Sequence, residues 1–295
     1  MFWGQSEGFL VQGVVRSEKT IQADSVGQVV HIVQAKPEGG NRGTVLLLHG
    51  LGDHIGRFDW AISLLCAAGY SVVGVDWPGN GNSEGIRGDM PTITKGGELI
   101  EEVLAVTGCK LIGLLAHSTG AFIAIKLLGS KLKAFEQLDW VWLNAPLIYP
   151  QHGQAPVKVI LAKLLAKIAP GMTMRTGVKP QDCYDDKQEF PEGVHNRFSV
   201  RFGMELLSAS REPEVLSGAI ATDAHILVVQ GDLDSVCPPP YSCRFFNSLA
   251  VREKTMLHVS GARHEPLGHS DARSIMGAIR AWLCHQAKKS PMTSD

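Results

Sequence analysis

Three features of the sequence predict an α/β fold with a mostly parallel central sheet, helices on both faces and an inserted helical cap. Short apolar runs alternate with segments of helical spacing across residues 44–145. The same alternation resumes at residues 225–286. Between the two lies a proline-rich segment in which no strand is evident, residues 147–213. Such alternation is typical of a parallel sheet that is covered by helices on both faces.

The composition is that of one large globular domain, or of a core domain with an insertion. The chain has 295 residues, and 44% of them are hydrophobic, which is enough for a sizeable core. The net charge of −1 gives no sign of nucleic-acid binding, so we expect no nucleic-acid partner. No apolar run reaches the roughly 18 residues of a membrane span, and the start of the chain does not resemble a secretory signal. We therefore expect a cytoplasmic protein.

The cysteines argue against a metal site or a disulfide framework. Six are present, and none forms a CxxC pair. Their positions are Cys66, Cys109, Cys183, Cys237, Cys243 and Cys284. Such scattered cysteines are typical of free thiols in a reducing compartment. We expect neither a metal nor a cofactor.

The first half of the chain predicts two leading strands followed by alternating units. The leading strands are Gly8–Ile21 and Val26–Ala35, with a turn at Asp24 and Ser25. The elements that follow are strand Thr44–His49, helix Arg57–Ala68, strand Tyr70–Asp76, helix Thr92–Val106, a strand and helix at 111–130, and strand Trp140–Ala145. The first of these strands is continuously apolar, as a strand buried on both faces should be.

The middle segment, residues 147–212, predicts a helical cap inserted into a core made of residues 1–146 and 213–295. It holds helical stretches at Val157–Ile168 and Ser199–Ser210. The α/β pattern then returns with strand His225–Gly231, helix Pro240–Leu249, strand Thr255–Val259 and helix Asp271–Gln286. A second independent domain is the alternative, but the segment is short and the sheet resumes after it.

The stretch Leu111–Phe122 predicts a strand, a tight turn and a helix, with Ser118 at the apex. This is the layout of a nucleophile elbow, in which the turn exposes a serine hydroxyl above the sheet. The residues two before and two after the serine must be small, and Ala116 and Gly120 stand there. The usual motif has glycine at both positions, so the methyl group of Ala116 must be accommodated. A helix N-cap serine is the alternative interpretation.

A serine nucleophile needs a base, and the base needs a third group that orients it. In this architecture the order along the chain is serine, acid, histidine. Asp234 lies in the loop after the resumed strand and is the expected acid, with Asp232 as the alternative. His264 lies in the loop after the next strand and is the expected base, with His269 as the alternative. The required order therefore favours catalysis by Ser118.

The same chemistry needs two backbone N–H donors for the developing oxyanion. One is expected from Thr119, directly after the nucleophile, and the other from the loop after the first core strand. That loop contains Gly50 and Gly52, which let the backbone approach a substrate closely. The N–H of Leu51, between them, is the expected donor.

Taken together, these motifs resemble the monoacylglycerol lipase branch of the α/β-hydrolases. The motifs that carry the resemblance are His49-Gly-Leu-Gly-Asp-His-Ile-Gly-Arg-Phe58, Asp76-Trp-Pro-Gly-Asn-Gly-Asn-Ser-Glu-Gly85, Ala116-His-Ser-Thr-Gly120, Gly231-Asp-Leu-Asp234 and Gly261-Ala-Arg-His-Glu265. Two cap stretches, 162–170 and 200–206, are also similar. The resemblance covers nearly the whole chain after Gly27. It departs from the family pattern at Ala116 and Trp77, and the loop from Asp76 to Gly85 is expected to shape the rim of the site.

The resemblance implies an α/β-hydrolase fold and a serine esterase or lipase. Its substrate would be a small-molecule acyl ester, most readily a monoacylglycerol or a lysolipid. The resemblance carries the catalytic roles onto Ser118, Asp234 and His264. It carries the oxyanion donors onto Leu51 and Thr119.

The cap stretch Val157–Ile168 has two interpretations. Its apolar side chains fall in one arc, and Lys158, Lys163 and Lys167 lie outside it. The arc could pack on the core, or it could form a lid that contacts lipid while the lysines meet anionic headgroups. The second interpretation predicts transient contact of the cap with a membrane surface. It also predicts an acyl pocket lined by Ile160, Leu161, Leu164 and Leu165. His195 and Arg197 are candidates for the glycerol end of the site.

Three functions remain open from the sequence. The first is an acyl-ester hydrolase with a lid. The second is a non-lipid serine hydrolase, such as a thioesterase, a carbon–carbon bond hydrolase or a peptidase. The third is a ligand-binding protein that uses this fold with little turnover. Dehalogenases and epoxide hydrolases are disfavoured, because they place aspartate at the elbow where this chain has Ser118.

Overall fold

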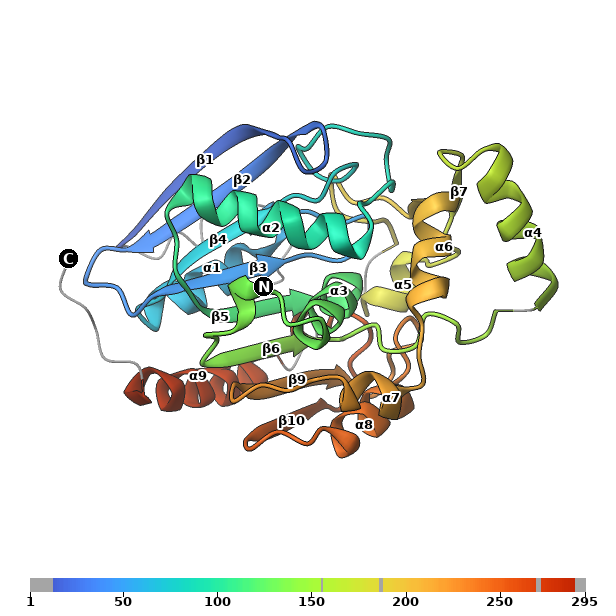
Figure 1. Cartoon of the computed structure of the whole chain (residues 1–295). Helices are drawn as coiled ribbons and strands as arrows, with labels where there is room; N and C mark the ends of the chain where they lie inside the picture. The colour runs from blue at the N-terminus through green and yellow to red at the C-terminus, as the bar shows by residue number, and fades with distance from the viewer. Residues whose placement is uncertain (1–12, 155, 186–187, 269–271, 290–295) are drawn as a thin grey trace.

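The computed structural model describes residues 13–154, 156–185, 188–268 and 272–289, and Figure 1 shows the whole chain. Within these residues, eight strands form one sheet in the order β1-β2-β4-β3-β5-β6-β9-β10. The strands are β1 Val14–Ala23, β2 Gln28–Pro37, β3 Thr44–Leu48, β4 Ser71–Val75, β5 Leu111–His117, β6 Trp140–Asn144, β9 His225–Gly231 and β10 Lys254–Val259. The β1–β2 and β2–β4 pairs are antiparallel, and every other pair is parallel. The predicted fold class is therefore confirmed.

Helices cover both faces of the sheet, as the alternating pattern predicts. They are α1 Asp59–Ala67, α2 Ile93–Thr107, α3 Ser118–Gly129, α7 Pro213–Gly218, α8 Pro239–Ser248 and α9 Ala272–Lys289. In Figure 1, α2 and α3 lie in front of the sheet, while α1 and α9 lie on its other face. The predicted strand start at Gly8, His269 and the predicted helix start at Asp271 lie outside the described residues. None of the described helices has both the length and the apolar character that crossing a membrane requires.

The two faces of the sheet have separate hydrophobic cores, and β3 shows why its sequence is apolar throughout. Leu46 and Leu48 contribute to the core beneath α2 and α3. Val45 and Leu47 contribute to the core beneath α1 and α9. Neighbouring side chains of a strand point to opposite faces, so every position of β3 is buried. Each such side chain contributes about 1.5–3 kcal/mol when it leaves water.

The parallel strands end together and define the edge at which the site is built. Leu48 of β3 is level with Ala116 of β5, and His117 of β5 is level with Asn144 of β6. On the other side, Gly231 of β9 is level with Val259 of β10. The loops after these strands therefore leave the sheet at one edge, as expected for a parallel sheet.

Residues 147–212 leave the sheet after β6 and return before β9, and they hold α4 Pro156–Ile168, β7 Thr173–Arg175, α5 Pro180–Cys183, β8 Arg197–Ser199 and α6 Val200–Ala209. Figure 1 shows these elements beyond the carboxyl edge of the sheet. The prediction that the segment has no strand is wrong, because β7 and β8 pair antiparallel. Each has only three residues, too few for a recognisable period of two.

Helix α6 joins this segment to the core. Its Phe202 is fully buried in the core beneath α2 and α3. The Glu205 carboxylate accepts from the N–H of Ile93 at the start of α2 (2.9 Å), and Arg201 donates to Asp89 (2.8 Å). Helix α4 packs on α6, so it is one layer further from the sheet.

Candidate active site

The elbow after β5 holds Ser118 in a strained conformation. Ser118 is the first residue of α3, and its φ of 51° lies in the left-handed region, which only glycine enters freely. A Cβ at Gly120 would lie 2.4 Å from the carbonyl oxygen of His49, so the turn needs glycine there. The methyl group of Ala116 is fully buried in the core. The elbow therefore accommodates alanine two residues before the serine but not two residues after it.

Ser118, His264 and Asp234 form a hydrogen-bonded chain. The Ser118 hydroxyl lies 2.9 Å from Nε2 of His264. The Nδ1–H of His264 donates to Oδ2 of Asp234, also at 2.9 Å. All three side chains are buried. Because Nδ1 carries the hydrogen, Nε2 is free to accept the serine proton, which is the arrangement of an activated nucleophile.

Four donors hold the Asp234 carboxylate in place. Besides His264, the N–H groups of Val236 and Cys237 donate to Oδ1, at 2.9 and 2.7 Å. The side-chain amide of Gln230 donates to Oδ2 at 3.1 Å. Donors of this kind stabilise a charged carboxylate. The Asp234 carboxylate is thus held in a fixed position beside His264.

The alternative acid points elsewhere. Asp232 is 43% exposed at its side chain, and its Oδ1 lies 3.3 Å from Nδ1 of His258. Of the two aspartates, the expected acid Asp234 is the one hydrogen-bonded to His264, and the alternative Asp232 is not. The alternative base, His269, lies outside the described residues.

The environment of His264 favours its charged form. Burial by itself lowers the pKa of His264, but Asp234 and, to a smaller extent, Cys237 together outweigh burial and raise this pKa well above its ordinary value. The carboxylate therefore stabilises the imidazolium that forms when His264 takes a proton.

The residues expected to supply the oxyanion donors lie at the same cavity. Leu51 and Thr119 line it together with Ser118 and His264. Thr119 is in the first turn of α3, where N–H groups have no acceptor within the helix. The loop around Leu51 is fixed on its far side, because the N–H of Gly52 donates to Oδ1 of Asn80 at 2.9 Å.

His49 and Trp77 support this loop from beneath. The N–H of Trp77 donates to Nε2 of His49 (2.9 Å), and the indole N–H donates to the His49 carbonyl (3.1 Å). Nδ1–H of His49 donates to the carbonyl of Gly50 at 2.7 Å. Burial lowers the pKa of His49, which keeps the ring neutral, as these bonds require. The loop that begins at Asp76 therefore does more than shape the rim, because it holds the loop that carries Leu51.

The cavity has a volume of about 150 Å³ and both parts of the chain line it. Residues from the middle segment form one side: Thr176, Val178, Cys183, Tyr184, Phe190, Val194, His195 and Asn196. His195 was a sequence candidate, and the structure brings it here. Arg197, the other candidate, is exposed and does not line the cavity.

Three of the predicted acyl-pocket residues of α4, Ile160, Leu164 and Leu165, do not line this cavity. Ile160 and Leu164 are 60% and 53% exposed, and Leu165 is half-buried. The side chain of Leu161 lies outside those described. Helix α4 packs on α6, and the cavity is lined by other residues of the middle segment. Helical periodicity identified the apolar face of α4 but not its partner.

A buried polar cluster on the other side of the cavity was not predicted. Arg57 lies 3.1 Å from Asp53 and 3.3 Å from Glu265, and His117 lies 3.3 Å from Glu265. Burial alone raises the pKa of Glu265, but the charges of Arg57 and His117 outweigh it and hold that pKa well below its usual range. Asp53 and Arg57 belong to the glycine-rich motif, and Glu265 directly follows His264. These residues could have been found from the sequence, because they lie next to residues that were predicted for the site.

The guanidinium of Arg57 already bridges the two carboxylates of this cluster. Ligand atoms of Asp53, His117 and Glu265 lie within 4.8 Å of one another, a spacing that could suit a metal ion. The guanidinium of Arg57 contacts both carboxylates and would repel a second cation. The arrangement therefore suits polar recognition by hydrogen bonds better than metal binding.

The sequence and the fold both have known relatives. Residues 39–271 match the Hydrolase_4 family, described as Serine aminopeptidase, S33. A monoacylglycerol lipase of Mycolicibacterium smegmatis is 25% identical over 285 residues, which cover 91% of this chain and 97% of that protein. The crystal structure of Paleococcus ferrophilus monoacylglycerol lipase is similar with a TM-score of 0.73 and 27% identity, over 92% of this chain and 99% of that one.

A third relative is much longer than this chain. It is an uncharacterized abhydrolase domain-containing protein of Dictyostelium discoideum, 25% identical over 247 residues. The match covers 81% of this chain but only 26% of that protein.

Proposed function

Because the chain belongs to the serine aminopeptidase S33 family of α/β-hydrolases, we propose that it is a carboxylic ester hydrolase that cleaves monoacylglycerols or lysolipid-type acyl esters. The observation that carries this proposal is the hydrogen-bonded chain from Ser118 through His264 to Asp234, which opens onto a cavity. The names of the lipase relatives support the choice of an acyl ester over other substrates.

In the first half of the proposed reaction, His264 takes the proton of Ser118 at Nε2 as the serine oxygen attacks the ester carbonyl. The carbonyl oxygen becomes an oxyanion, which accepts hydrogen bonds from the N–H groups of Leu51 and Thr119. The tetrahedral intermediate collapses, the ester bond to the alcohol breaks, and His264 returns the proton to the departing alcohol. An acyl group remains on Ser118.

In the second half, water replaces the alcohol. His264 takes a proton from water, the resulting hydroxide attacks the acyl carbonyl, and the bond to Ser118 breaks. The serine recovers its proton from His264, and a carboxylic acid leaves. Throughout, Asp234 keeps the imidazole in the Nδ1–H tautomer and stabilises its charged form.

The buried polar cluster suits the alcohol part of the substrate. Asp53, Arg57 and Glu265 line the same cavity as Ser118. Carboxylates accept and a guanidinium donates hydrogen bonds, so together they match the free hydroxyl groups of a glycerol. We propose that this cluster holds the head of the substrate while the acyl chain leaves the cavity elsewhere.

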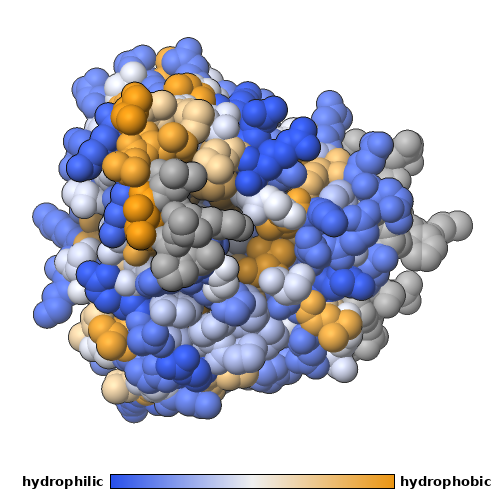
Figure 2. Space-filling view, turned by 90° about the vertical axis from the view of Figure 1, so that its right-hand side faces the viewer, coloured by the Kyte–Doolittle hydropathy of each residue, from blue (hydrophilic) through white to orange (hydrophobic). Residues whose placement is uncertain are grey.

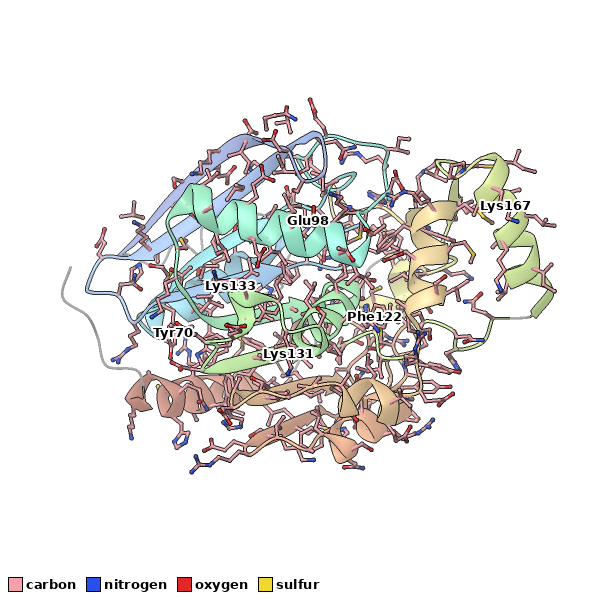
Figure 3. All side chains as sticks on the ribbon, viewed as in Figure 1. Tyr70, Glu98, Phe122, Lys131, Lys133 and Lys167 are labelled. Carbon is pink, nitrogen blue, oxygen red and sulfur yellow. The ribbon has the colours of Figure 1, made fainter. Side chains whose placement is uncertain are left out.

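We further propose that residues 147–212 act as a cap that covers the site and contacts a lipid surface. The exposed apolar side chains on this segment are Ile160, Leu164, Ile168, Met172 and Met174. Residues 155–180 carry five lysines or arginines and no aspartate or glutamate. Figure 2 views the molecule from the cap side, where apolar and polar residues lie side by side, and Figure 3 shows Lys167 on the outermost helix, α4. This combination suits the surface of an anionic bilayer.

A matched set of acyl substrates tests the proposed activity. Monoacylglycerols and p-nitrophenyl esters of increasing chain length would be compared with a thioester and an aminoacyl p-nitroanilide. We expect ester turnover that rises with chain length, because acyl burial contributes about 0.8 kcal/mol per CH₂. Turnover of the anilide alone would instead favour the peptidase that the family description names. Absence of turnover on every substrate would favour a ligand-binding protein.

A further inference from the structure

The middle segment contacts the loop that carries His264 through its backbone. The N–H of Glu265 donates to the carbonyl of Cys183 at 3.1 Å, and the N–H of His264 faces the carbonyl of Asp182 at 3.4 Å. Asp182 and Cys183 belong to α5, whose first turn is closed by the Asp182 side chain on the N–H of Lys179 (2.8 Å). A short helix of the middle segment thus lies directly against the backbone of the catalytic base.

The same segment contacts the loop that carries Leu51. The N–H of His195 donates to the carbonyl of Gly52 at 2.8 Å. The ring of His54 donates from Nε2 to the carbonyl of Glu192 at 3.0 Å. The approach is so close that a Cβ at Gly52 would lie 1.9 Å from the carbonyl oxygen of His195. Gly52 is therefore bound on both sides, by Asn80 at its N–H and by His195 at its carbonyl.

The ring of His195 strengthens this contact. Its Nε2–H donates to the carbonyl of Gly79 at 3.3 Å, and its Nδ1 accepts from the N–H of Arg197 at 3.2 Å. Gly79 precedes Asn80, the residue that binds Gly52 from the core. The peptide and the ring of His195 therefore contact both the loop that carries Leu51 and the loop that supports it.

We propose that these two contacts position the catalytic groups, so that the middle segment acts on the reaction and does not merely cover it. We call them the backbone clamp: the carbonyls of Asp182 and Cys183 against the His264 loop, and the N–H of His195 against Gly52. His195 is then a positioning residue for the Leu51 donor. This inference rests on the proposed hydrolase function.

The clamp and a plain cover make opposite predictions for a very short ester. p-Nitrophenyl acetate has no acyl chain that needs the middle segment. Loosening a plain cover leaves its kcat unchanged or raises it, since access improves. Loosening the clamp lowers kcat, because the oxyanion donor and the base lose their alignment, while KM changes little.

Two variants loosen the same contact from opposite sides. Gly52→Ala adds a methyl group against the His195 carbonyl, and its control is Gly108→Ala, which has a similar left-handed φ of +66° but open space around it. His195→Ala removes the ring anchors from the other side, and its control is His285→Ala, an exposed histidine of α9. In each pair the variant and its control carry the same chemical change, but only the variant changes a residue of the clamp.

The experiment measures kcat and KM on p-nitrophenyl acetate together with backbone hydrogen exchange of residues 49–58. We expect kcat to fall about 100-fold in Gly52→Ala and about tenfold in His195→Ala, with faster exchange in both, since one lost oxyanion donor costs about 10²–10³ in kcat. Both controls should stay within about twofold of the wild type in kcat and in exchange.

Two results would overturn the clamp. One is unchanged exchange of residues 49–58 in both Gly52→Ala and His195→Ala, which would mean that neither the backbone contact nor the ring contacts of the middle segment hold the loop. The other is faster exchange with an intact kcat, which would mean that the contact does not position the donor. If the wild type hydrolyses no ester, the proposed function and the positioning role both fail, while the exchange rates still support or overturn the contact itself.

Discussion

The loops at the carboxyl edge of the sheet and the middle segment that faces them are held by different kinds of contact. Asp234 and His49 sit in the core loops with buried side-chain hydrogen bonds from several directions. The strands beneath them are buried along their length, as β3 and β4 show. In the middle segment, β7 is three residues long and largely exposed, and α4 exposes large apolar side chains. Local stability follows the number of buried contacts, so we expect the core loops to open less readily than the exposed parts of the middle segment.

The largest effect is expected from a substitution in the core loops. Ser118→Ala removes the nucleophile, and we expect kcat on any ester to fall by about 10⁴–10⁶, as losses of a triad member typically do. Near-normal thermal unfolding of the variant would establish that the fold is retained. Turnover close to that of the wild type would exclude Ser118 as the nucleophile.

The next effect separates two aspartates of one loop. Asp234→Asn leaves His264 without its carboxylate, and we expect kcat to fall by about 10⁴, as the corresponding change does in other triads. Asp232→Asn is the matched control, because the Asp232 side chain is 43% exposed and pairs with His258 rather than with His264. It should stay within about twofold, since surface substitutions away from a site change little. The reverse ranking would assign the acid to Asp232.

The pH profile gives Asp234→Asn a second measurement. The carboxylate raises the pKa of His264, and the reaction needs the neutral imidazole. In the wild type, kcat/KM should therefore rise with pH through a pKa above the ordinary value for histidine. Without the anion that pKa falls, so the residual activity of the variant should reach its plateau at lower pH. An unmoved acid limb would mean that another group controls the profile.

The same contrast between regions explains what could be predicted from the sequence. The core elements follow local rules: Thr92 caps α2 by accepting from the N–H of Lys95, and Gly108 ends it with a left-handed φ. The order of Ser118, Asp234 and His264 could be predicted because parallel strands bring successive loops to one edge. Each of these predictions needs only short stretches of sequence.

The missed features depend on contacts between distant segments. The strands β7 and β8 are too short to show a period, and the pairing of Arg57 with Glu265 joins loops about 200 residues apart. The apolar arc of α4 was visible, but packing on α6 leaves part of it exposed. Tertiary packing decides which partner an amphipathic face finds.

The smallest expected effect tests the looser region. Leu164→Asp replaces a 53% exposed leucine on α4, far from the cavity that holds Ser118. We expect kcat on soluble p-nitrophenyl acetate to stay within about twofold, because an exposed substitution changes little in the fold. Binding to anionic vesicles, measured by sedimentation, should weaken about tenfold or more, since burying a leucine side chain in lipid contributes about 1.5–3 kcal/mol. Val106→Asp is the control, as Val106 is 51% exposed on α2 of the core, and it should bind vesicles like the wild type. Equal vesicle binding by Leu164→Asp and the wild type would mean that this face does not contact lipid, and a parallel loss of acetate hydrolysis would mean that α4 supports the core.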